Sequence, residues 1–393
     1  MQLWQPSLPQ EYLSMDRGEL ASRIARRREQ LGDRLLILGH HYQVDDVIRH
    51  ADVTGDSLKL SQIAAERVAQ TGAEFVVFCG VHFMAESADM LAPQGTSVIL
   101  PDLSAGCSMA DMADYEDAVD AWDAIQETLQ MQRWNGRVIP ITYVNSTAAV
   151  KAFVGQRGGA CCTSSNADKV FAWAMAGGDK PKRDDEAIKI LFLPDQHLGR
   201  NTAHAYGIDT AARTCVYDPK AARRGEGIGG STPEQIAQSD VILWAGHCSV
   251  HKLFRPEHCD AARAEDSAVT ILVHPECAKE VVDKSDLSGS TEYIIRTIEA
   301  AEPGTSWAVG TEFNLVNRLK NEAAARGVRV RVLSDCQCLC TTMYRIDEPH
   351  LLWVLDGLVE GTVRNRIEVH PEATKHALVA LDRMLSLVEP TPA

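Results

Sequence analysis

The chain has 393 residues, 54 of them acidic and 39 Lys or Arg, so its formal net charge is −15. This length exceeds what one hydrophobic core usually supports and predicts two or three domains. The negative charge disfavours nucleic acid and anionic membranes as partners, because their phosphate groups would be repelled. No run approaches the ~20 apolar residues of a membrane span, and the N-terminus lacks the basic and apolar segments of a secretion signal. We therefore expect a cytoplasmic protein.

The first part of the chain alternates strand patterns with helix patterns. An Arg-rich helix is predicted over residues 15–32. Short apolar runs bounded by Gly or Pro then predict strands at 35–39, 75–79 and 97–100. Helical patterns follow the first two of these runs. This alternation indicates right-handed βαβ units, which form a parallel sheet with helices on both faces.

The same alternation recurs twice further along the chain. In the second block, helices are predicted at 116–131 and 167–175, and strands at 137–143, 158–162 and 188–193. In the third block, strands are predicted at 241–245, 269–273, 307–310 and 328–333. A Gly-rich segment over 223–231 is typical of a domain boundary. The element order predicts three tandem blocks, over 1–115 with an N-terminal extension, 116–232, and 233–393 with C-terminal helices.

Polar side chains follow the predicted strand ends in all three blocks. Open parallel sheets bind their ligands at this edge. Three pairs have a spacing of two residues, so both members of a pair point the same way if the extended geometry persists. These pairs are His40 with Tyr42, Tyr143 with Asn145, and His274 with Glu276.

The chain contains 11 cysteines, an odd number that argues against a disulfide framework. The run Cys336, Cys338, Cys340 is spaced C-x-C-x-C, which matches neither a zinc ribbon nor a ferredoxin cluster. Each block nevertheless offers one cysteine in a loop after a strand, namely Cys107, Cys248 and Cys340. Three thiolates at one shared centre would explain why no local motif is complete. The alternative is a set of unrelated loop cysteines that pack as small apolar residues.

Nine short motifs then occur in order along the chain. They are LGHHYQ at 38–43, GDSL at 55–58, CGVHFMAE at 79–86, GCSMADM at 106–112, YVNST at 143–147, TSSNA at 163–167, GHCSVH at 246–251, HPEC at 274–277 and C-x-x-M at 340–343. With these motifs the chain closely resembles the quinolinate synthase family of bacterial NAD biosynthesis, from about residue 35 to its C-terminus. The first 30 or so residues and the segment 223–231 fall outside the resemblance.

The resemblance implies an α/β fold of three tandem αβα-sandwich domains with short parallel sheets, in a pseudo-threefold arrangement around a central active site. It also implies one [4Fe-4S] cluster held by one cysteine from each domain. Carried over to this chain, the ligands are Cys107, Cys248 and Cys340, with Cys338 as the alternative to Cys340. Three protein ligands leave one iron open, and that iron can act as a Lewis acid.

The family's reaction condenses iminoaspartate with dihydroxyacetone phosphate to quinolinate, with loss of phosphate and water. Glu276 is the expected general base with His274 beside it, while Tyr42 and His40 are expected to transfer protons. His40, His274 and Glu276 are also expected to contact substrate. The neutral donors expected to bind substrate oxygens are Ser57, Tyr143, Asn145, Ser164, Ser290 and Thr291. A transient contact with the enzyme that produces iminoaspartate is a further expectation.

Several features lie outside this scheme. A second HPE tripeptide at 370–372 is interpreted as the start of an amphipathic helix, because Pro suits the first helical turn. Cys161 and Cys162 are adjacent and are expected to pack in the core. Whether they, with Cys336 and Cys338, regulate the protein by forming disulfides is left open.

Two other function classes stay in view. One is a zinc-dependent lyase or hydrolase with His and Glu ligands, and the other is a non-catalytic iron-sulfur sensor, which the acidic charge disfavours.

Overall fold

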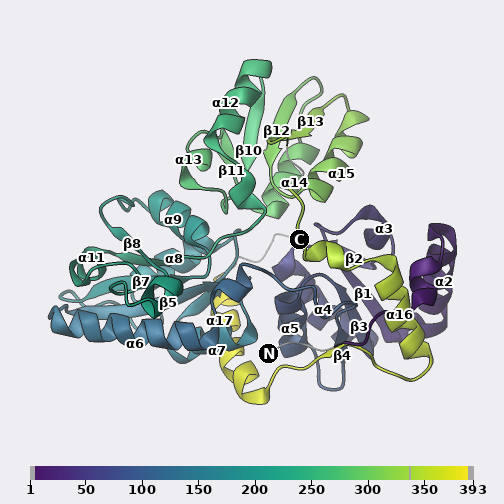
Figure 1. The fold of residues 1–393 in the computed structure, drawn as a ribbon, viewed down its shortest axis with the longest axis horizontal. Coiled ribbons are helices and arrows are strands. Elements are labelled where there is room, and N and C mark those ends of the chain that lie inside the picture. The colour runs from purple at the N-terminus through teal and green to yellow at the C-terminus, as the bar shows by residue number, and fades with distance from the viewer. Residues whose placement is uncertain (1–4, 336–337, 388–393) are drawn as a thin grey trace. The chain divides into compact units, whose positions relative to one another are not determined.

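The computed structural model describes residues 5–335 and 338–387 (Figure 1). Their contacts divide the chain into two compact units. The first unit combines Met1–Cys107, Glu312–Arg318 and Leu339–His370, and the second combines Ser108–Thr311, Leu319–Cys338 and Pro371–Ala393. Three short, mainly parallel sheets carry the fold, which confirms the predicted α/β class. In the described ranges, no helix has the length and apolar character needed to span a bilayer.

The first unit is built on a five-stranded sheet in the order β14-β4-β3-β1-β2. Its strands are β1 Leu35–His40, β2 Val53–Gly55, β3 Phe75–Cys79, β4 Ser97–Ile99 and β14 Arg366–Ile367. The first four are parallel, and β14 joins β4 in the antiparallel direction. Every β1 residue after Leu35 is buried, as expected for a central strand covered on both faces. The end of β1 therefore holds His40 firmly at the carboxyl edge of this sheet.

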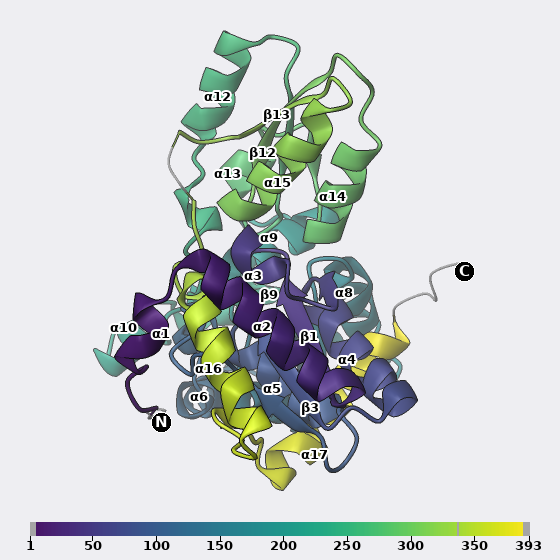
Figure 2. The same cartoon turned by 90° about the vertical axis from the view of Figure 1, so that its right-hand side faces the viewer.

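Helices cover this sheet, and one helix from the N-terminal part of the unit packs on one from its C-terminal part. The helices are α1 Gln10–Ser14, α2 Arg17–Leu31, α3 Asp45–Ile48, α4 Ser57–Thr71, α5 His82–Leu91 and α16 Glu348–Val359, with 3₁₀ turns η1 Gly32–Arg34 and η4 Met343–Arg345. Helices α2 and α16 run side by side (Figure 2). Arg23 and Arg27 of α2 pair with Asp356 of α16, which is 2% exposed. Part of the Arg-rich face predicted at the surface thus neutralises a buried carboxylate, which would otherwise destabilise the unit.

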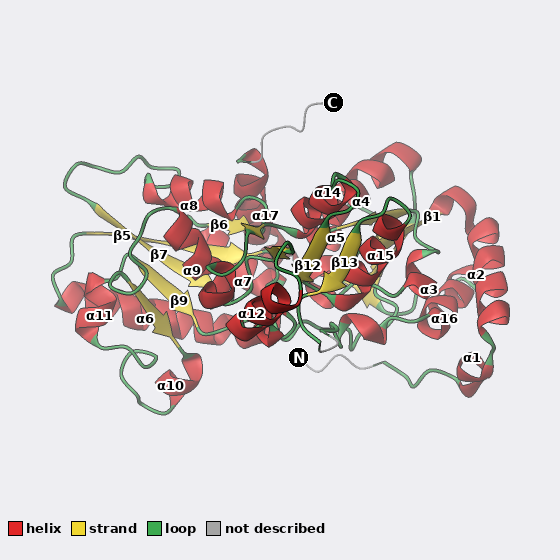
Figure 3. Cartoon of the chain, turned by 90° about the horizontal axis from the view of Figure 1, so that it is seen from above, coloured by secondary structure: helices red, strands yellow, loops and turns green. Residues whose placement is uncertain are grey.

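The second unit contains a fully parallel five-stranded sheet in the order β6-β5-β7-β9-β8. Its strands are β5 Gly136–Tyr143, β6 Ala160–Cys162, β7 Ala187–Leu193, β8 Thr214–Tyr217 and β9 Val241–Trp244. Its helices are η2 Ala110–Met112, α6 Tyr115–Met131, α7 Ala148–Gln156, α8 Ala167–Met175, α9 Gln196–Ala205, α10 Pro219–Arg223, α11 Pro233–Gln238 and α17 Pro371–Ser386. Helices α8 and α9 cover one face, and α6 and α11 cover the other (Figures 1 and 3).

The Gly-rich segment 223–231 does not separate two sheets, as was expected. It lies between β8 and β9, which pair directly from Thr214↔Val241 to Tyr217↔Trp244. Its glycines Gly225, Gly227, Gly229 and Gly230 all have positive φ, so the segment is a left-handed turn region that Gly tolerates at no steric cost. Glycine richness here reflects turn geometry inside one layer. The division into domains at 1–115, 116–232 and 233–393 stays a prediction.

The C-terminal helix α17 begins at Pro371, as predicted for the second HPE tripeptide. It packs closely on α7 of the five-stranded sheet. Gly155 permits this close approach, since a Cβ at that position would lie 2.0 Å from the His376 carbonyl oxygen. The C-terminal helices were expected to belong with the third sheet. Helix α17 instead packs with the helices of the second sheet.

The third sheet, also in the second unit, has four parallel strands in the order β11-β10-β12-β13. They are β10 Thr270–Val273, β11 Leu287–Ser288, β12 Ser306–Gly310 and β13 Arg329–Val332, with helices η3 His251–Leu253, α12 Pro256–Glu265, α13 Lys279–Val282, α14 Thr291–Glu299 and α15 Phe313–Ala324. The long strands of this sheet confirm the patterns at 269–273, 307–310 and 328–333. The carboxyl end of β10 leads straight into the HPEC motif.

Candidate active site

The loop after β10 carries the predicted base. His274 and Glu276 are 2% and 3% exposed, so both side chains lie inside the second unit. The loop turns tightly, with the Cys277 N–H donating to the His274 carbonyl oxygen at 3.0 Å. From α9, the Asn201 amide donates to the carbonyl oxygens of Pro275 and Cys277 at 2.8 and 2.9 Å. Because buried carbonyl groups need partners, these two bonds fix the backbone on both sides of Glu276.

A second histidine holds the Glu276 carboxylate. His251 Nδ1 lies 2.8 Å from Glu276 Oε2, and His251 Nε2 lies 3.1 Å from Thr311 Oγ1. The His251 ring stacks on the His274 ring, with centroids 4.4 Å apart and planes inclined by 18°. An ionised carboxylate only accepts hydrogen bonds, so His251 Nδ1 carries a proton and donates it to Glu276. His251 lies in the GHCSVH motif, but the 25 residues that separate it from Glu276 hid this contact at the level of sequence.

Burial and charge set the protonation of this cluster. Burial by itself raises the pKa of Glu276, but the neighbouring His251 and His274, with hydrogen bonds from His251 and Tyr143, outweigh it and hold that pKa below its usual range. Burial lowers the pKa of His274 to about 3. At neutral pH an ionised Glu276 therefore lies beside a neutral His274, which is the state required of a general base.

A second buried carboxyl group, Asp195, follows β7 and is 0% exposed. Its Oδ1 accepts the N–H groups of His197 and Leu198 at 2.7 and 2.9 Å and so caps α9, whereas its Oδ2 has no hydrogen-bond partner among the described residues. Burial, and then the negative charge of Glu276, raise the pKa of Asp195. The environments of the two carboxyl groups thus push their pKa values apart, the usual arrangement of acid and base partners. Sequence reasoning identified Asp195 only as the end of a strand.

The described cysteines divide by exposure into two groups. Cys107, Cys248 and Cys340, the three predicted ligands, are half-buried. The buried group is Cys79, Cys161, Cys162, Cys215, Cys259, Cys277 and Cys338, and Cys336 lies outside the described residues. Burial raises the pKa of Cys161 to about 12, which favours the neutral thiol and the predicted packing role. Cys338, the alternative to Cys340, is 0% exposed.

These three half-buried thiols have the donor chemistry that an iron-sulfur cluster requires, because such clusters are held by cysteine sulfur. Cys107 and Cys340 belong to the first unit and Cys248 to the second, so their convergence on one cluster stays a prediction. Within the second unit, donor atoms of Cys248, His251 and Glu276 all lie within 4.8 Å of one another. Both ring nitrogens of His251 already make hydrogen bonds, however, so a metal ion at these donors would have to break one of them.

In the first unit, the predicted pair at the end of β1 comes together. The Tyr42 N–H donates to His40 Nδ1 at 3.1 Å, and the two rings meet edge to face with centroids 4.8 Å apart. His40 is 4% exposed. Residues 41 and 42 form a turn after β1, so the extended geometry on which the predicted common orientation depended does not persist, and the two rings meet across this turn. Ser57, a predicted substrate donor, lies at the first position of α4, where the Asp56 side chain caps the helix.

Glu312 is a buried carboxyl group of the first unit that sequence reasoning missed. It is 0% exposed, and its oxygens accept from the Asn314 amide and the Leu315 N–H, each at 3.1 Å. Burial raises the pKa of Glu312 to about 8. The Asn314 amide also donates to the Tyr42 carbonyl oxygen at 3.2 Å, so one side chain connects Glu312 to the Tyr42 loop.

Other predicted substrate donors belong to the second unit. Ser164 and Ser290 line a common pocket of about 390 Å³ that Asn201 and Pro275 also border, so this pocket adjoins the HPE loop. The Ser290 hydroxyl accepts the Tyr293 N–H and caps α14, whose first residue is Thr291. Tyr143, at the end of β5, is one of the groups that hydrogen-bond Glu276. Asn145 Oδ1 is buried and has no hydrogen-bond partner among the described residues, as expected of an amide whose partner is a bound molecule.

Comparison with known proteins identifies the family. A model of the quinolinate synthetase A protein family matches residues 22–386. The chain belongs to the quinolinate synthase family. The quinolinate synthase of Acidobacterium capsulatum is 52% identical over 96% of this chain and 95% of its own length. The quinolinate synthase of Herpetosiphon aurantiacus is 50% identical over 96% of this chain and 95% of its own length. That of a Nocardioides species is 53% identical over 94% of this chain and 89% of its own length.

Membership of the quinolinate synthase family confirms the resemblance drawn from the nine motifs. The matched region begins at residue 22, within α2 and somewhat before the predicted start near residue 35. The Gly-rich turn between β8 and β9 lies inside the matched region. The chain is thus an enzyme of the quinolinate synthase family over nearly its whole length.

Proposed function

We propose that the protein synthesises quinolinate for NAD biosynthesis by condensing iminoaspartate with dihydroxyacetone phosphate, with release of inorganic phosphate and water. The observation that carries this proposal is the buried Glu276 carboxyl group, held by His251 and packed beside Cys248. Ring formation from these two substrates needs repeated removal of protons from carbon and the loss of hydroxyl groups. A carboxylate that stays ionised inside the protein suits the first task.

The second unit supplies the base and keeps it oriented. Glu276 accepts the proton from substrate carbon, and the His251 hydrogen bond fixes the carboxylate so that one oxygen stays directed at the substrate. His274, with its pKa held low by burial, serves as a neutral hydrogen-bonding group for a substrate oxygen. Burial and the nearby Glu276 charge raise the pKa of Asp195, which favours its neutral form beside the base.

The remaining predicted donors bind the anionic ends of the substrates. Ser164 and Ser290 border one pocket, and hydroxyl groups there suit phosphate or carboxylate oxygens. The buried Oδ1 of Asn145 needs a hydrogen-bond donor, which a substrate imine N–H or hydroxyl group would provide. In this proposal Tyr42 and His40 exchange protons with a substrate oxygen, and Ser57 and Thr291 complete the set of binding residues.

Cys107, Cys248 and Cys340 would hold a [4Fe-4S] cluster, whose one iron without a protein ligand supplies Lewis acidity toward a substrate hydroxyl. Their shared half-buried state, against the burial of the other described cysteines, supports this ligand set. Thiolate ligands persist in a reducing compartment, which favours a cytoplasmic enzyme. Transient contact with the enzyme that produces iminoaspartate remains part of the proposal.

The test is metal analysis combined with an activity assay. Anaerobically purified wild type should contain about four irons and four acid-labile sulfides per chain, as a single [4Fe-4S] cluster requires, and should form quinolinate from the two substrates. Alanine at Cys107, Cys248 or Cys340 should lose the cluster, while Cys259→Ala, at a buried cysteine outside the motifs, should keep it. A cluster that survives all three ligand substitutions would refute the assignment.

A zinc enzyme is the second candidate, because Cys248, His251 and Glu276 form a compact group of zinc-type donors. Stoichiometric zinc without sulfide in the anaerobic protein, lost on His251→Ala, would favour it. The two hydrogen bonds that already occupy the His251 ring argue for the quinolinate synthase mechanism instead.

A further inference from the structure

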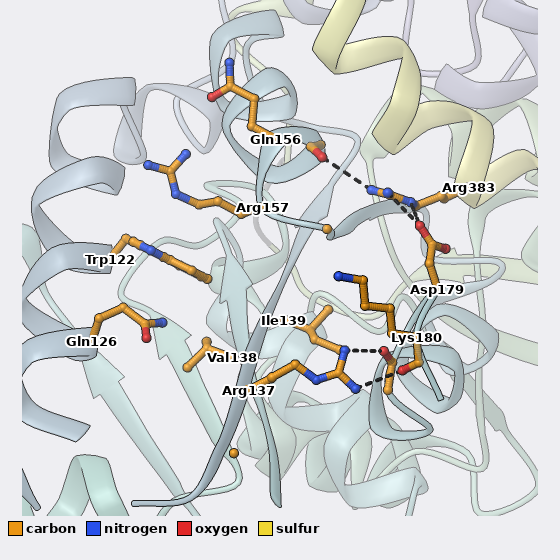
Figure 4. Close-up of a pocket in the computed structure, with 14 residues that line it drawn as sticks. Trp122, Gln126, Arg137, Val138, Ile139, Gln156, Arg157, Asp179, Lys180 and Arg383 are labelled. Atoms are coloured by element: carbon orange, nitrogen blue, oxygen red, sulfur yellow. Dashed lines mark hydrogen bonds and ion pairs between the residues drawn. The ribbon is translucent and has the colours of Figure 1, made fainter. Parts of the chain in front are cut away.

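The second unit has a pocket of about 570 Å³ that the proposed chemistry does not use. It lies at the amino end of β5, where Gly136 begins the strand, whereas Tyr143 of the candidate site lies at the carboxyl end. Its walls come from α6, β5, the end of α7, the turn after α8, and α17 (Figure 4). Pockets of ~300–1,000 Å³ are typical of small-molecule sites. The pocket is thus large enough for a metabolite and separate from the predicted substrate residues.

The lining is positively charged in a chain whose net charge is −15. Four cationic side chains face it, from Arg137, Arg157, Lys180 and Arg383, and Asp179 is the one carboxylate that lines it. Arg137 is neutralised by Glu186 at 2.7 Å and Arg383 by Asp179 at 2.6 Å. These two arginines therefore build the walls of the pocket and are already paired.

The other two cations, Arg157 and Lys180, form no ion pair with any residue in the described part of the chain. Arg157 is half-buried, and burial lowers its pKa, while Tyr115 and Asp123 oppose this effect more weakly. Lys180 is exposed. In Figure 4, Arg157 lies on one side of the pocket and Lys180 on the other. A partly desolvated guanidinium without an anion is unfavourable, and a bound anion would relieve that cost.

An aromatic wall accompanies the unpaired guanidinium. The Arg157 Cζ atom lies 5.5 Å from the Trp122 ring centroid and 3.9 Å from that of Phe153. Trp122 is half-buried and lines the pocket beside Gln126. An indole ring favours planar, polarizable groups, and the Gln126 amide offers both a donor and an acceptor to a heterocycle.

We propose that this pocket binds a small phosphorylated molecule with a planar heterocycle, of the mononucleotide class. Arg157 holds the phosphate, Lys180 adds positive charge from the opposite side of the pocket, and Trp122 contacts the ring. Arginine suits this task because its planar fork matches two phosphate oxygens. The site is distinct from the pocket of Ser164 and Ser290, so it stands whether or not the proposed reaction is correct.

Isothermal titration calorimetry of the full-length protein tests the proposal with adenosine monophosphate as the probe. Ribose 5-phosphate, which lacks the ring, and adenosine, which lacks the phosphate, should each bind at least about tenfold more weakly, a loss of about 1.4 kcal/mol. The double variant Arg157→Ala/Lys180→Ala should weaken adenosine monophosphate at least about tenfold. Trp122→Leu should weaken adenosine monophosphate but leave ribose 5-phosphate unchanged.

Lys182→Ala is the matched control, because Lys182 is exposed two residues from Lys180 and does not line the pocket. It should bind adenosine monophosphate like wild type. Lys180→Glu changes one exposed side chain and leaves the packing of Arg157 intact. It should bind adenosine monophosphate more weakly than wild type. Absence of binding to wild type, or equal affinities in wild type and the double variant, would overturn the proposal.

Discussion

Glu276→Gln separates the chemical role of the carboxylate from its structural role. Gln keeps the shape of the side chain and can still accept the hydrogen bond that His251 Nδ1 donates at 2.8 Å. A charge-assisted bond becomes a neutral one, which costs about 1 kcal/mol of stability. Removing a buried charge offsets part of that cost. We therefore expect a folded variant with an unchanged cysteine environment.

The catalytic effect should be much larger than the structural one. A positioned general base contributes roughly 10²–10⁴-fold to rate, which corresponds to about 3 to 5 kcal/mol of transition-state stabilisation. The assay is anaerobic quinolinate formation from iminoaspartate and dihydroxyacetone phosphate, with iron and sulfide content measured on the same sample. We expect kcat to fall by that factor while the metal content matches wild type.

The second HPE tripeptide provides the matched control. Glu372 occupies the same place in the tripeptide but is exposed in the first turn of α17. Glu372→Gln should therefore leave kcat unchanged. A Glu276→Gln enzyme that keeps its cluster and turns over within tenfold of wild type would refute the assignment of Glu276 as the base.

Three further substitutions test the HPE loop, the contact between α17 and α7, and a buried lysine of the second unit. Asn201→Ala removes both hydrogen bonds to the carbonyl oxygens that flank Glu276, so the free energy of unfolding in urea should fall by about 2 kcal/mol, and kcat should also fall. Unchanged values would show that these two bonds do not hold the HPE loop. Gly155→Ala places a methyl group 2.0 Å from the His376 carbonyl oxygen and should cost about 1–3 kcal/mol in the same measurement. Burial lowers the pKa of Lys189 from 10.5 to about 8, so the folded protein binds fewer protons than the unfolded chain between those values. Stability relative to Lys189→Met should therefore rise as pH increases from 8 to 10.5, and a flat difference would show that the ammonium group is not desolvated.

The sequence by itself determined the class of fold and most of the elements of the sheets. Strands such as β1 and β3 were predictable because fully buried parallel strands read as short apolar runs between Gly and Pro signals. The start of α17 was predictable because Pro371 suits a first helical turn and cannot continue a preceding one. Local patterns decided all of these features.

Only the tertiary structure decided which distant side chains meet. His251 contacts Glu276 across 25 residues, and Asn201 reaches the HPE loop across 74 and 76. The opposite pKa shifts of Glu276 and Asp195 depend on burial and on their proximity, and neither can be read from residue spacing. The Gly-rich segment 223–231 was predicted to be a domain boundary, but it connects two strands of one sheet. Its glycines would look the same in either setting, because turns inside a domain and linkers between domains use the same residues. Long-range packing selects among such local possibilities, because side-chain burial and hydrogen-bond partners exist only after the layers have assembled.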